Sequence, residues 1–309
     1  MSAAELNNPA LLIDGVLVLD KPKGPTSTAC LNKVKRALRV KKAGHAGTLD
    51  PMASGVLLLL LGQATKLSSH LMGRKVYSGS IELGRTTDTW DAEGETLETK
   101  KVDNITLFQV EEAVENWLNL TDQAVPAYSA AKHQGQPLYK LSREGKPVPE
   151  KVKQIKIFRA ELLDFSSPHI KFRVECSSGT YIRSLAHSLG IRLGTGATLT
   201  ELIREYSHPF TLEQAVSVEA ACERPELALT RVIGIAEALA DWPKLTLSEA
   251  ESQAVQHGNP VACPQGLAPG AQVLLLDQQK LPLALAEAAL QGESENEVPM
   301  LRVLRGLWR

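Results

Sequence analysis

The stretch GHAGTLDPMASGVLLLLLG, residues 44–62, joins a glycine-rich loop to an uninterrupted apolar run. The run at 56–61 is far shorter than the roughly 18 residues of a membrane helix, so it predicts a buried strand. The loop before it holds one carboxylate, Asp50, followed by Pro51. A lone Asp before proline is most simply a turn residue. A nucleophilic function would require a fixed cation beside the carboxylate and an apolar wall that excludes water.

The chain on both sides of this loop predicts rigid elements. Residues 15–19 are an apolar run typical of a buried strand. Residues 27–39 repeat apolar side chains at four-residue spacing, with Thr26 or Ser27 as N-cap, and predict an amphipathic helix. The Asp50 loop is therefore expected to be held at both ends. Strands are further predicted at 77–83, 155–157 and 170–176, and helices at 110–120 and after Gly179.

Two other segments differ in character from this core. Residues 124–152 are rich in Pro, Gly, Lys and Tyr with poor periodicity, which indicates an exposed insertion. Around residues 241–243 the chain has the composition of a linker. We therefore expect one domain at 10–240 and a small mixed or barrel-like β domain at 243–309. The second domain is predicted to contain a helix at 248–257 ended by Gly258 and strands at 273–276, 281–285 and 301–304.

Charge is distributed unevenly although the net charge is only -1. Residues 21–49 contain eight basic and no acidic side chains, and residues 132–159 carry a net charge of +6. Two concentrated basic segments on an otherwise acidic chain favour a polyanion-binding surface. The alternative is two solvated faces that never meet.

Several function classes lack their sequence signatures. The four cysteines contain no C-x-x-C pair, and no two of the seven histidines are four residues apart. With no dinucleotide fingerprint or Walker loop, we expect no metal and no cofactor. The first ten residues carry no secretory signal and no segment has membrane-helix length, so we expect a cytoplasmic protein without a membrane partner.

Five segments, taken together, resemble bacterial TruB-type tRNA pseudouridine synthases in order and spacing. The resemblance covers most of residues 14–210. It implies a mixed α/β catalytic domain whose central, mostly antiparallel sheet is flanked by helices, followed by a small PUA-like β domain that binds RNA. The segments are DKPKGPTS (20–27), GHAGTLDPMASGVLLLLLGQATK (44–66), KVYSGSIELGRTTDTWDAEG (75–94), VPAYSAAKHQGQPLYKLSREG (125–145) and CSSGTYIRSLAHSLG (176–190).

The resemblance also implies a role for individual residues. Asp50 would be the catalytic aspartate, Tyr77 would stack on the target base, and Arg183 would pair with Asp50. Ser178 departs from the lysine that is common in the family, which puts one phosphate contact in doubt. The residues implied to bind substrate or RNA are His45, Leu202, Tyr181, Lys21 and Lys132.

The implied activity is isomerisation of uridine to pseudouridine at position 55 in the T-loop of tRNA. The target base leaves its stack, the glycosidic bond at N1 breaks, and a new bond forms at C5 with the help of Asp50. The residues leave open whether the carboxylate attacks C1′ or C6 or removes a sugar proton. No cofactor is implied, the partner is tRNA through its T-loop and acceptor arm, and the enzyme is expected to be a monomer.

Three alternatives remain at this point. A guide-RNA-dependent, dyskerin-like synthase shares the aspartate loop, but the insertion at 124–152 favours an enzyme that grips tRNA itself. An RNA-binding or RNA-folding chaperone with a retained pocket is the second alternative. A glycoside hydrolase would need a second carboxylate, for which Asp88 and Asp91 are available in a segment that is more typical of a structural turn.

Overall fold

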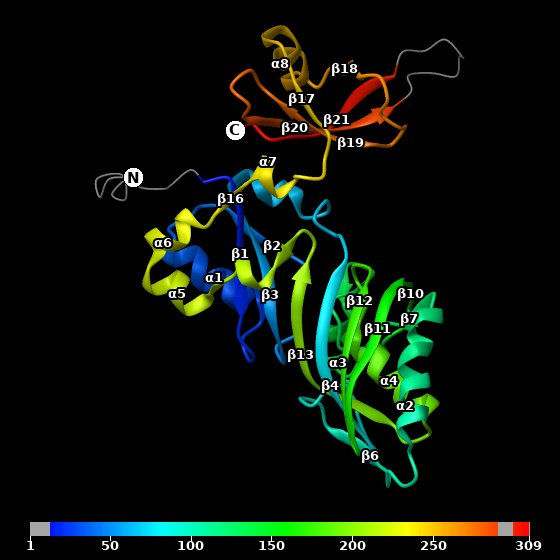
Figure 1. The fold of residues 1–309 in the computed structure, drawn as a ribbon. Coiled ribbons are helices and arrows are strands. Elements are labelled where there is room, and N and C mark those ends of the chain that lie inside the picture. Colours follow the sequence, from blue (N-terminus) through cyan, green and yellow to red (C-terminus); the bar gives the residue numbers. More distant parts are fainter. Residues whose placement is uncertain (1–12, 290–298, 309) are drawn as a thin grey trace.

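The computed structural model describes residues 13–289 and 299–308 and consists of a large sheet-based body with a smaller β unit at one end (Figure 1). Residues 1–12, which include the ten N-terminal residues and the first residues of the expected domain at 10–240, lie outside the described ranges. Within those ranges, no helix combines the length and apolar character needed to cross a bilayer.

The body is built on one mixed sheet of ten strands, with the main order β11-β12-β4-β13-β3-β1-β15. Pairing is parallel between β1 and β15 and between β13 and β3, and antiparallel at the other junctions, so the expected mostly antiparallel sheet is confirmed. Its strands are β1 (Gly15–Lys21), β2 (Ala43–Ala46), β3 (Ala53–Leu61), β4 (Lys75–Leu83), β11 (Ile157–Ser166), β12 (His169–Cys176), β13 (Ala197–Ser207), β14 (Phe210–Thr211), β15 (Val216–Ser217) and β16 (Ile233–Gly234).

Three helices pack on one face of this sheet. α1 (Ser27–Ala37) begins after Thr26, whose hydroxyl accepts a hydrogen bond from the third helical residue. α2 (Leu107–Glu115) has a capping box and continues as the 3-10 turn η3 (Asn116–Asn119). α4 (Ile182–Arg192) is the helix predicted after Gly179. Apolar residues of all three helices and of the sheet form one core cluster.

β3 is buried on both faces, which explains its uninterrupted apolar sequence. Leu57, Leu59 and Leu61 belong to the core under the helices. Their neighbours belong to a second core on the opposite face, namely Val56, Leu58 and Leu60.

The remaining elements of the body are short. The hairpin of β5 and β6 lies at the far end of the sheet from the C-terminal unit (Figure 1). These elements are β5 (Arg85–Thr87), β6 (Thr96–Thr99), η2 (Gly62–Leu67), η4 (Leu212–Gln214), α5 (Val218–Glu223), α6 (Pro225–Thr230) and α7 (Ile235–Ala238).

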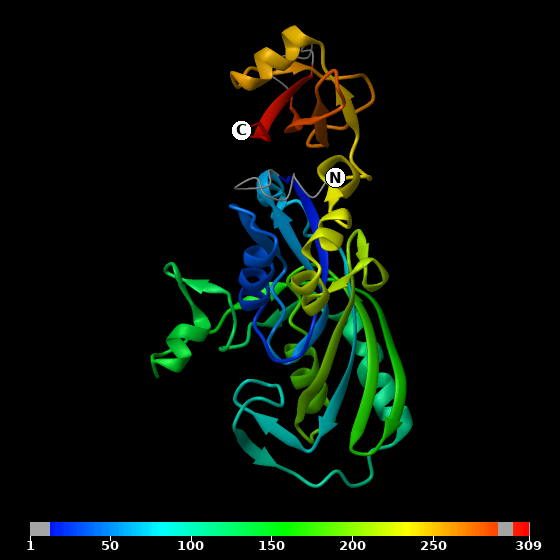
Figure 2. The same cartoon turned by 90° about the vertical axis from the view of Figure 1, so that its left-hand side faces the viewer.

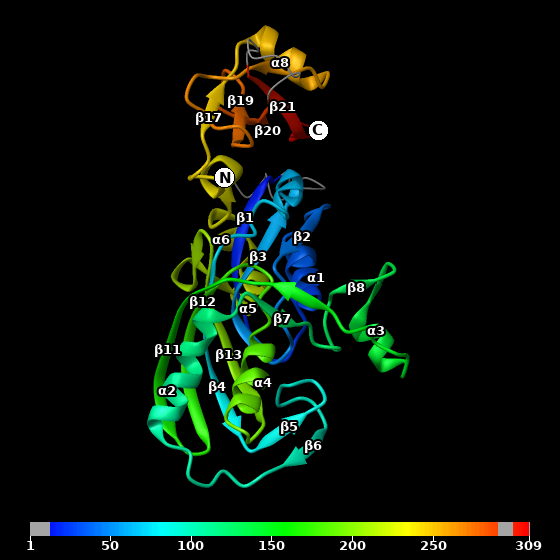
Figure 3. The ribbon, with the colours of Figure 1, turned by 90° about the vertical axis from the view of Figure 1, so that its right-hand side faces the viewer.

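The insertion expected at 124–152 has secondary structure of its own and projects from the body on the side where α1 lies (Figures 2 and 3). At its tip Gln134 and Gly135 have φ of +48° and +83°, the signature of a two-residue type I′ hairpin turn. Its elements are β7 (Asp122–Ala124), β8 (Lys132–His133), β9 (Gln136–Pro137), α3 (Leu138–Arg143) and β10 (Val152–Gln154), with β7 paired to β10 at the base.

The C-terminal unit is a five-stranded sheet with one helix, α8 (Glu249–Gln256), which is consistent with the expected PUA-like domain. Gly258, with φ of +83°, follows the helix as predicted. The unit packs on the second core of the body through apolar residues that include Leu274, Leu285 and Leu307. Its strands are β17 (Lys244–Thr246), β18 (Val261–Ala262), β19 (Gln272–Leu276), β20 (Pro282–Ala289) and β21 (Met300–Gly306).

Candidate active site

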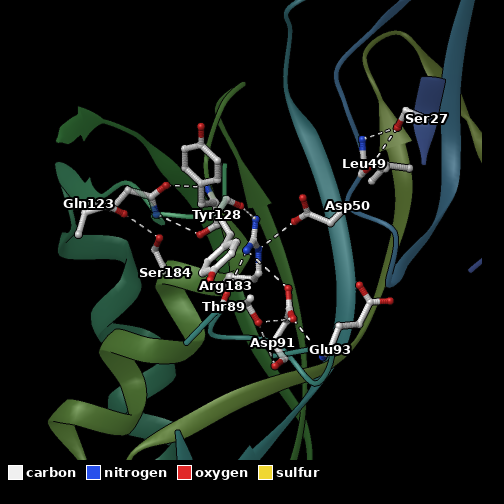
Figure 4. Close-up of polar contacts among 12 residues, drawn as sticks. Ser27, Leu49, Asp50, Thr89, Asp91, Glu93, Gln123, Tyr128, Arg183 and Ser184 are labelled. Carbon is white, nitrogen blue, oxygen red and sulfur yellow. Dashed lines mark hydrogen bonds and ion pairs between the residues drawn. The ribbon is translucent and has the colours of Figure 1, made fainter. Parts of the chain in front are cut away.

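The loop that carries Asp50 is fixed by side chains from three separate elements. The Ser27 hydroxyl, at the start of α1, donates to the Leu49 carbonyl and accepts from the Leu49 N–H, both at 2.9 Å (Figure 4). From β1, the fully buried Lys21 ammonium donates to the Ala53 carbonyl at 2.7 Å. From β13, Arg204 donates to the Gly47 carbonyl at 2.8 Å. The main-chain groups of Gly47, Leu49 and Ala53, on the two sides of Asp50, are therefore held by buried side chains.

Arg204 also explains two of the glycines in the loop motif. Gly47 has φ of +72° and Gly55 has φ of +99°, a region that disfavours side chains. A Cβ on Gly55 would lie 2.3 Å from the Arg204 carbonyl oxygen. The guanidinium of Arg204 makes a further 2.7 Å hydrogen bond to the carbonyl of Val56. The glycines thus permit the close approach of β13 to the loop.

Arg183 lies beside Asp50, with 2.9 Å between its Nε and the carboxylate Oδ2 (Figure 4). The N–H of that nitrogen is not aligned with an acceptor, so the contact is an ion pair and not a linear hydrogen bond. The Arg183 side chain is 4% exposed and the Asp50 side chain 36% exposed. The cation is therefore buried while the carboxylate remains open on one side.

Other groups hold the guanidinium independently of Asp50. Its Nη1 donates to the Thr89 carbonyl at 3.0 Å, and its Nη2 donates to the Tyr128 carbonyl at 2.9 Å. The buried Asp91 carboxylate lies 3.5 Å from Nη1. Asp91 was expected to be only a turn residue, and it does organise its turn by accepting from Thr89 Oγ1 at 2.6 Å. It is also the second carboxylate of the site.

Glu93 adds a third acidic group near the same arginine (Figure 4). Burial, followed by the negative charges of Asp91 and Asp50, raises the pKa of Glu93. One buried guanidinium therefore faces several carboxylates. The positive charge of the arginine offsets the mutual repulsion of these carboxylates.

Tyr77 lies on β4 opposite Arg204 of β13 and is 8% exposed. Burial raises the pKa of the Tyr77 phenol, whereas the charge of Arg204 and its hydrogen bond to the phenol oppose that rise. Leu202, 6% exposed, precedes Arg204 by two residues on the same strand. The aromatic ring and the leucine are thus mounted on neighbouring strands beside the Asp50 loop.

Gln123 fixes the chain just before α4. Its side-chain amide accepts from the Tyr181 N–H at 2.5 Å and donates to the Tyr181 carbonyl at 3.2 Å. Ser184, one turn into the helix, donates to the Ala124 carbonyl at 2.7 Å (Figure 4). The base of the insertion is therefore attached to the helix that carries Arg183.

The other residues implied to bind RNA lie in different environments. His45 on β2 is half-buried, and burial followed by the charge of Arg204 lowers its pKa. Lys132 is exposed on the insertion. The RNA contact of Lys21 stays a prediction, because in this structure its ammonium is fully buried and bonded to main-chain carbonyls. Through these bonds Lys21 positions the Asp50 loop.

Sequence reasoning missed three polar residues that organise the site: Arg204, Gln123 and Asp91. Arg204 lies in a strand next to Glu205 and has the appearance of a solvated charge. Only the approach of β13 to β3, more than a hundred residues away in the chain, makes it internal. The one available signal was its place two residues after Leu202, on the same face of a predicted strand.

The arrangement offers a charged carboxylate with a fixed cation, an aromatic ring and an apolar side. In the part of the chain that the structure describes, no group of three or more His, Cys, Asp or Glu side chains could hold a metal ion. The groups present are suited to nucleophilic or proton-abstracting carboxylate chemistry on a planar ring.

Comparisons with known proteins identify the family of the chain. A family model described as TruB family pseudouridylate synthase (N terminal domain) matches residues 35–182. The tRNA pseudouridine synthase B of Oleidesulfovibrio alaskensis is 56% identical over 302 residues, which cover 95% of this chain and 96% of that protein. The protein of the same name from Syntrophotalea carbinolica is 40% identical over 303 residues, covering 94% of this chain and 98% of the other.

Solved structures share the fold across the whole chain. The crystal structure of a Cbf5-Nop10-Gar1 complex matches with a TM-score of 0.71 and 25% identity over 96% of this chain and 85% of the other. The archaeal box H/ACA sRNP Nop10-Cbf5 complex matches with a TM-score of 0.70 and 24% identity, covering 99% of this chain and 89% of that chain. Those assemblies carry the same architecture at much lower identity. The chain belongs to the TruB family of pseudouridine synthases.

Proposed function

We propose that this protein isomerises uridine to pseudouridine at position 55 in the T-loop of tRNA. The observation that carries the proposal is the ion pair of Asp50 with the buried Arg183, on a loop held by three elements. The relatives named tRNA pseudouridine synthase B match over nearly the full chain, which supports tRNA as the substrate.

The site accounts for the chemistry as follows. The target uridine leaves its stack at a cost of a few kcal/mol, and stacking on an aromatic ring such as Tyr77 recovers about 1–3 kcal/mol. Asp50, held in an ion pair with Arg183, reacts with the everted nucleotide so that the bond from C1′ to N1 breaks. The uracil turns, C5 joins C1′, and the proton on C5 must leave. Tyr77 is the nearby group that we assign to this last step.

Arg204 serves this reaction as a positioning residue. It links the phenol of Tyr77 to the Gly47 and Val56 carbonyls on the two sides of Asp50. The two groups that touch the base are therefore held by one buried side chain. Such fixed geometry lowers the barrier because little reorganisation remains for the reactive complex.

Two basic segments provide the RNA surface. Seven basic residues at 23–42, all exposed or partly exposed, lie on α1 and in the segments on either side of it, and the insertion projects on the same side of the body as α1 (Figures 2 and 3). We infer that they contact phosphates and 2′-hydroxyls of the folded T-arm, because A-form RNA is recognised mainly by shape. The C-terminal unit would contact the acceptor arm. We further propose a monomeric, cytoplasmic enzyme.

The dyskerin-like alternative rests on the shared fold with chains from box H/ACA complexes, whereas identity is far higher to the relatives named tRNA pseudouridine synthase B. Incubation of the purified protein with a naked tRNA transcript and no guide RNA separates the two. Our proposal requires pseudouridine at position 55 under these conditions. Conversion only in the presence of a guide RNA would favour the alternative.

A substitution at Asp50 separates catalysis from a chaperone function. Asp50→Asn preserves size and removes the charge, so we expect tRNA binding to persist while pseudouridine formation disappears. Product can be followed by mapping pseudouridine in the treated tRNA. Undiminished product formation by Asp50→Asn would remove Asp50 from its assigned role.

A further inference from the structure

Lys153, on β10 at the base of the insertion, has an unusual position. Its side chain extends over Gly179 so closely that a Cβ added to the glycine would overlap Lys153 Nζ and lie 2.8 Å from its Cε. Gly179 has φ of +80° and is the third residue of a turn closed by the Thr180 N–H and the Ser177 carbonyl, 3.3 Å apart. A turn of type II requires glycine there, and the missing side chain leaves the space that the lysine occupies.

The pairing of β7 with β10 explains why the lysine reaches this turn. Lys153 is directly opposite Gln123 in the antiparallel register. Residues directly opposite one another project from the same face of a sheet. Gln123 uses that face to hold the main chain of Tyr181. Lys153 therefore points at the same loop two residues earlier, immediately before the helix that carries Arg183.

The Lys153 ammonium has no carboxylate partner among the described residues. Two other cations between residues 132 and 159 do have carboxylate partners: Lys146 pairs with Glu144, and Arg159 pairs with Glu161. Lys153 itself is only half-buried, so its charge can still meet a ligand from solution. Ser178, beside it in the turn, contributes no charge of its own.

We infer that Lys153 binds an RNA phosphate adjacent to the flipped nucleotide, at the turn formed by residues 177–180. This inference rests on the proposed function, since it needs tRNA in the site. An anion is the matching ligand because an unpaired ammonium attracts it, and the carboxylates of the site would repel it if it moved toward Asp50. The lysine thus defines where the backbone of the RNA passes while the base lies against Tyr77.

The test compares tRNA binding by the wild type and Lys153→Gln over a series of salt concentrations. Neutralising one phosphate contact on RNA should reduce the slope of log K against log salt by roughly 0.7–0.9. We expect KM to rise severalfold with kcat nearly unchanged, because the phosphate is held equally in ground and transition states. Lys171→Gln on β12 is the matched control, since that exposed lysine faces Asp164 and should leave the slope unaltered.

Two further variants exclude a merely structural role. Lys153→Arg should retain the wild-type slope. Ser178→Lys, which places a cation on the neighbouring residue, should restore the slope in the Lys153→Gln background. An unchanged slope in Lys153→Gln, with or without a loss of thermal stability, would overturn the inference. If the wild type itself neither binds nor converts tRNA, the proposed function fails, which is a different result.

Discussion

The Asp50 loop and the insertion are both irregular connections, but they are held in opposite ways. Buried side chains from β1, α1 and β13 reach the Asp50 loop from distant parts of the chain. The insertion is stabilised mainly by its own hairpin and by local bonds such as the one from the Leu138 N–H to the Ala131 carbonyl. The loop that we propose to perform the chemistry is thus fixed by distant parts of the chain, whereas the insertion that we propose to contact RNA is held mainly by local contacts.

The largest expected difference in stability is between alanine substitutions at Gly55 in the Asp50 loop region and at Gly135 in the insertion. Gly55→Ala would place a Cβ 2.3 Å from the Arg204 carbonyl oxygen at φ of +99°. The strained backbone and the overlap should together destabilise the protein by about 3 kcal/mol or more. Gly135→Ala has a similar φ of +83° but open space around it, so about 1 kcal/mol is expected. Urea unfolding of both variants measures the difference, and equal losses would break the comparison.

The next largest effect is a pH dependence of stability, which comes from the buried amine of Lys75 on β4. Burial, with the charge of Arg204, lowers the pKa of Lys75 to about 7, and its Nζ donates to Ser207 Oγ at 2.7 Å. Between pH 7 and the unfolded pKa near 10.4 the unfolded chain binds a proton that the folded chain lacks. Stability should therefore rise with pH in this window, by about 2 kcal/mol from pH 7.5 to pH 9.

Lys75→Met removes this titration and serves as the reference. The difference in unfolding free energy between wild type and variant should grow as pH rises. Curves that stay parallel from pH 7 to pH 9 would mean that Lys75 is protonated in the fold throughout.

Ser27→Ala removes one of the three clamps on the Asp50 loop. Both polar main-chain groups of Leu49 lose a buried partner, for an expected cost of about 1–2 kcal/mol. Because the loop carries the carboxylate that we propose to be catalytic, kcat should fall about tenfold by misplacement while the affinity for tRNA stays the same. Single-turnover assays and filter binding measure the two quantities. A loss of affinity with kcat retained would contradict the role assigned to the clamp.

The smallest change in stability is expected on the insertion. Lys132→Gln and Lys140→Gln alter exposed charges, so unfolding free energies should stay within about 0.5 kcal/mol of wild type. Their tRNA affinity should nevertheless fall, with a shallower salt dependence. Unfolding that shifts as much as in Ser27→Ala would show that the insertion is as firmly held as the loop.

The sequence was sufficient to predict many of the helices and strands, but not the buried polar side chains that connect them. The apolar run at 56–61 and the four-residue repeat at 27–39 predicted β3 and α1, because burial pattern is local information. The ion pair of Asp50 with Arg183 followed only from resemblance, since 133 positions separate the two residues in the chain. Lys21 and Arg204 were not recognisable as internal, because a buried cation looks like a surface one until its carbonyl partners are known.

The two-sided burial of β3 has a consequence for truncated forms of the protein. Leu58 and Leu60 are covered partly by residues that come after position 270, such as Leu285 and Leu307. Deleting the C-terminal unit would expose these apolar side chains to water. They lie on β3, the strand that follows Asp50 in the chain. A shortened chain ending near position 242 should therefore aggregate when expressed. The C-terminal unit thus completes the hydrophobic core of the larger domain and is required for its solubility.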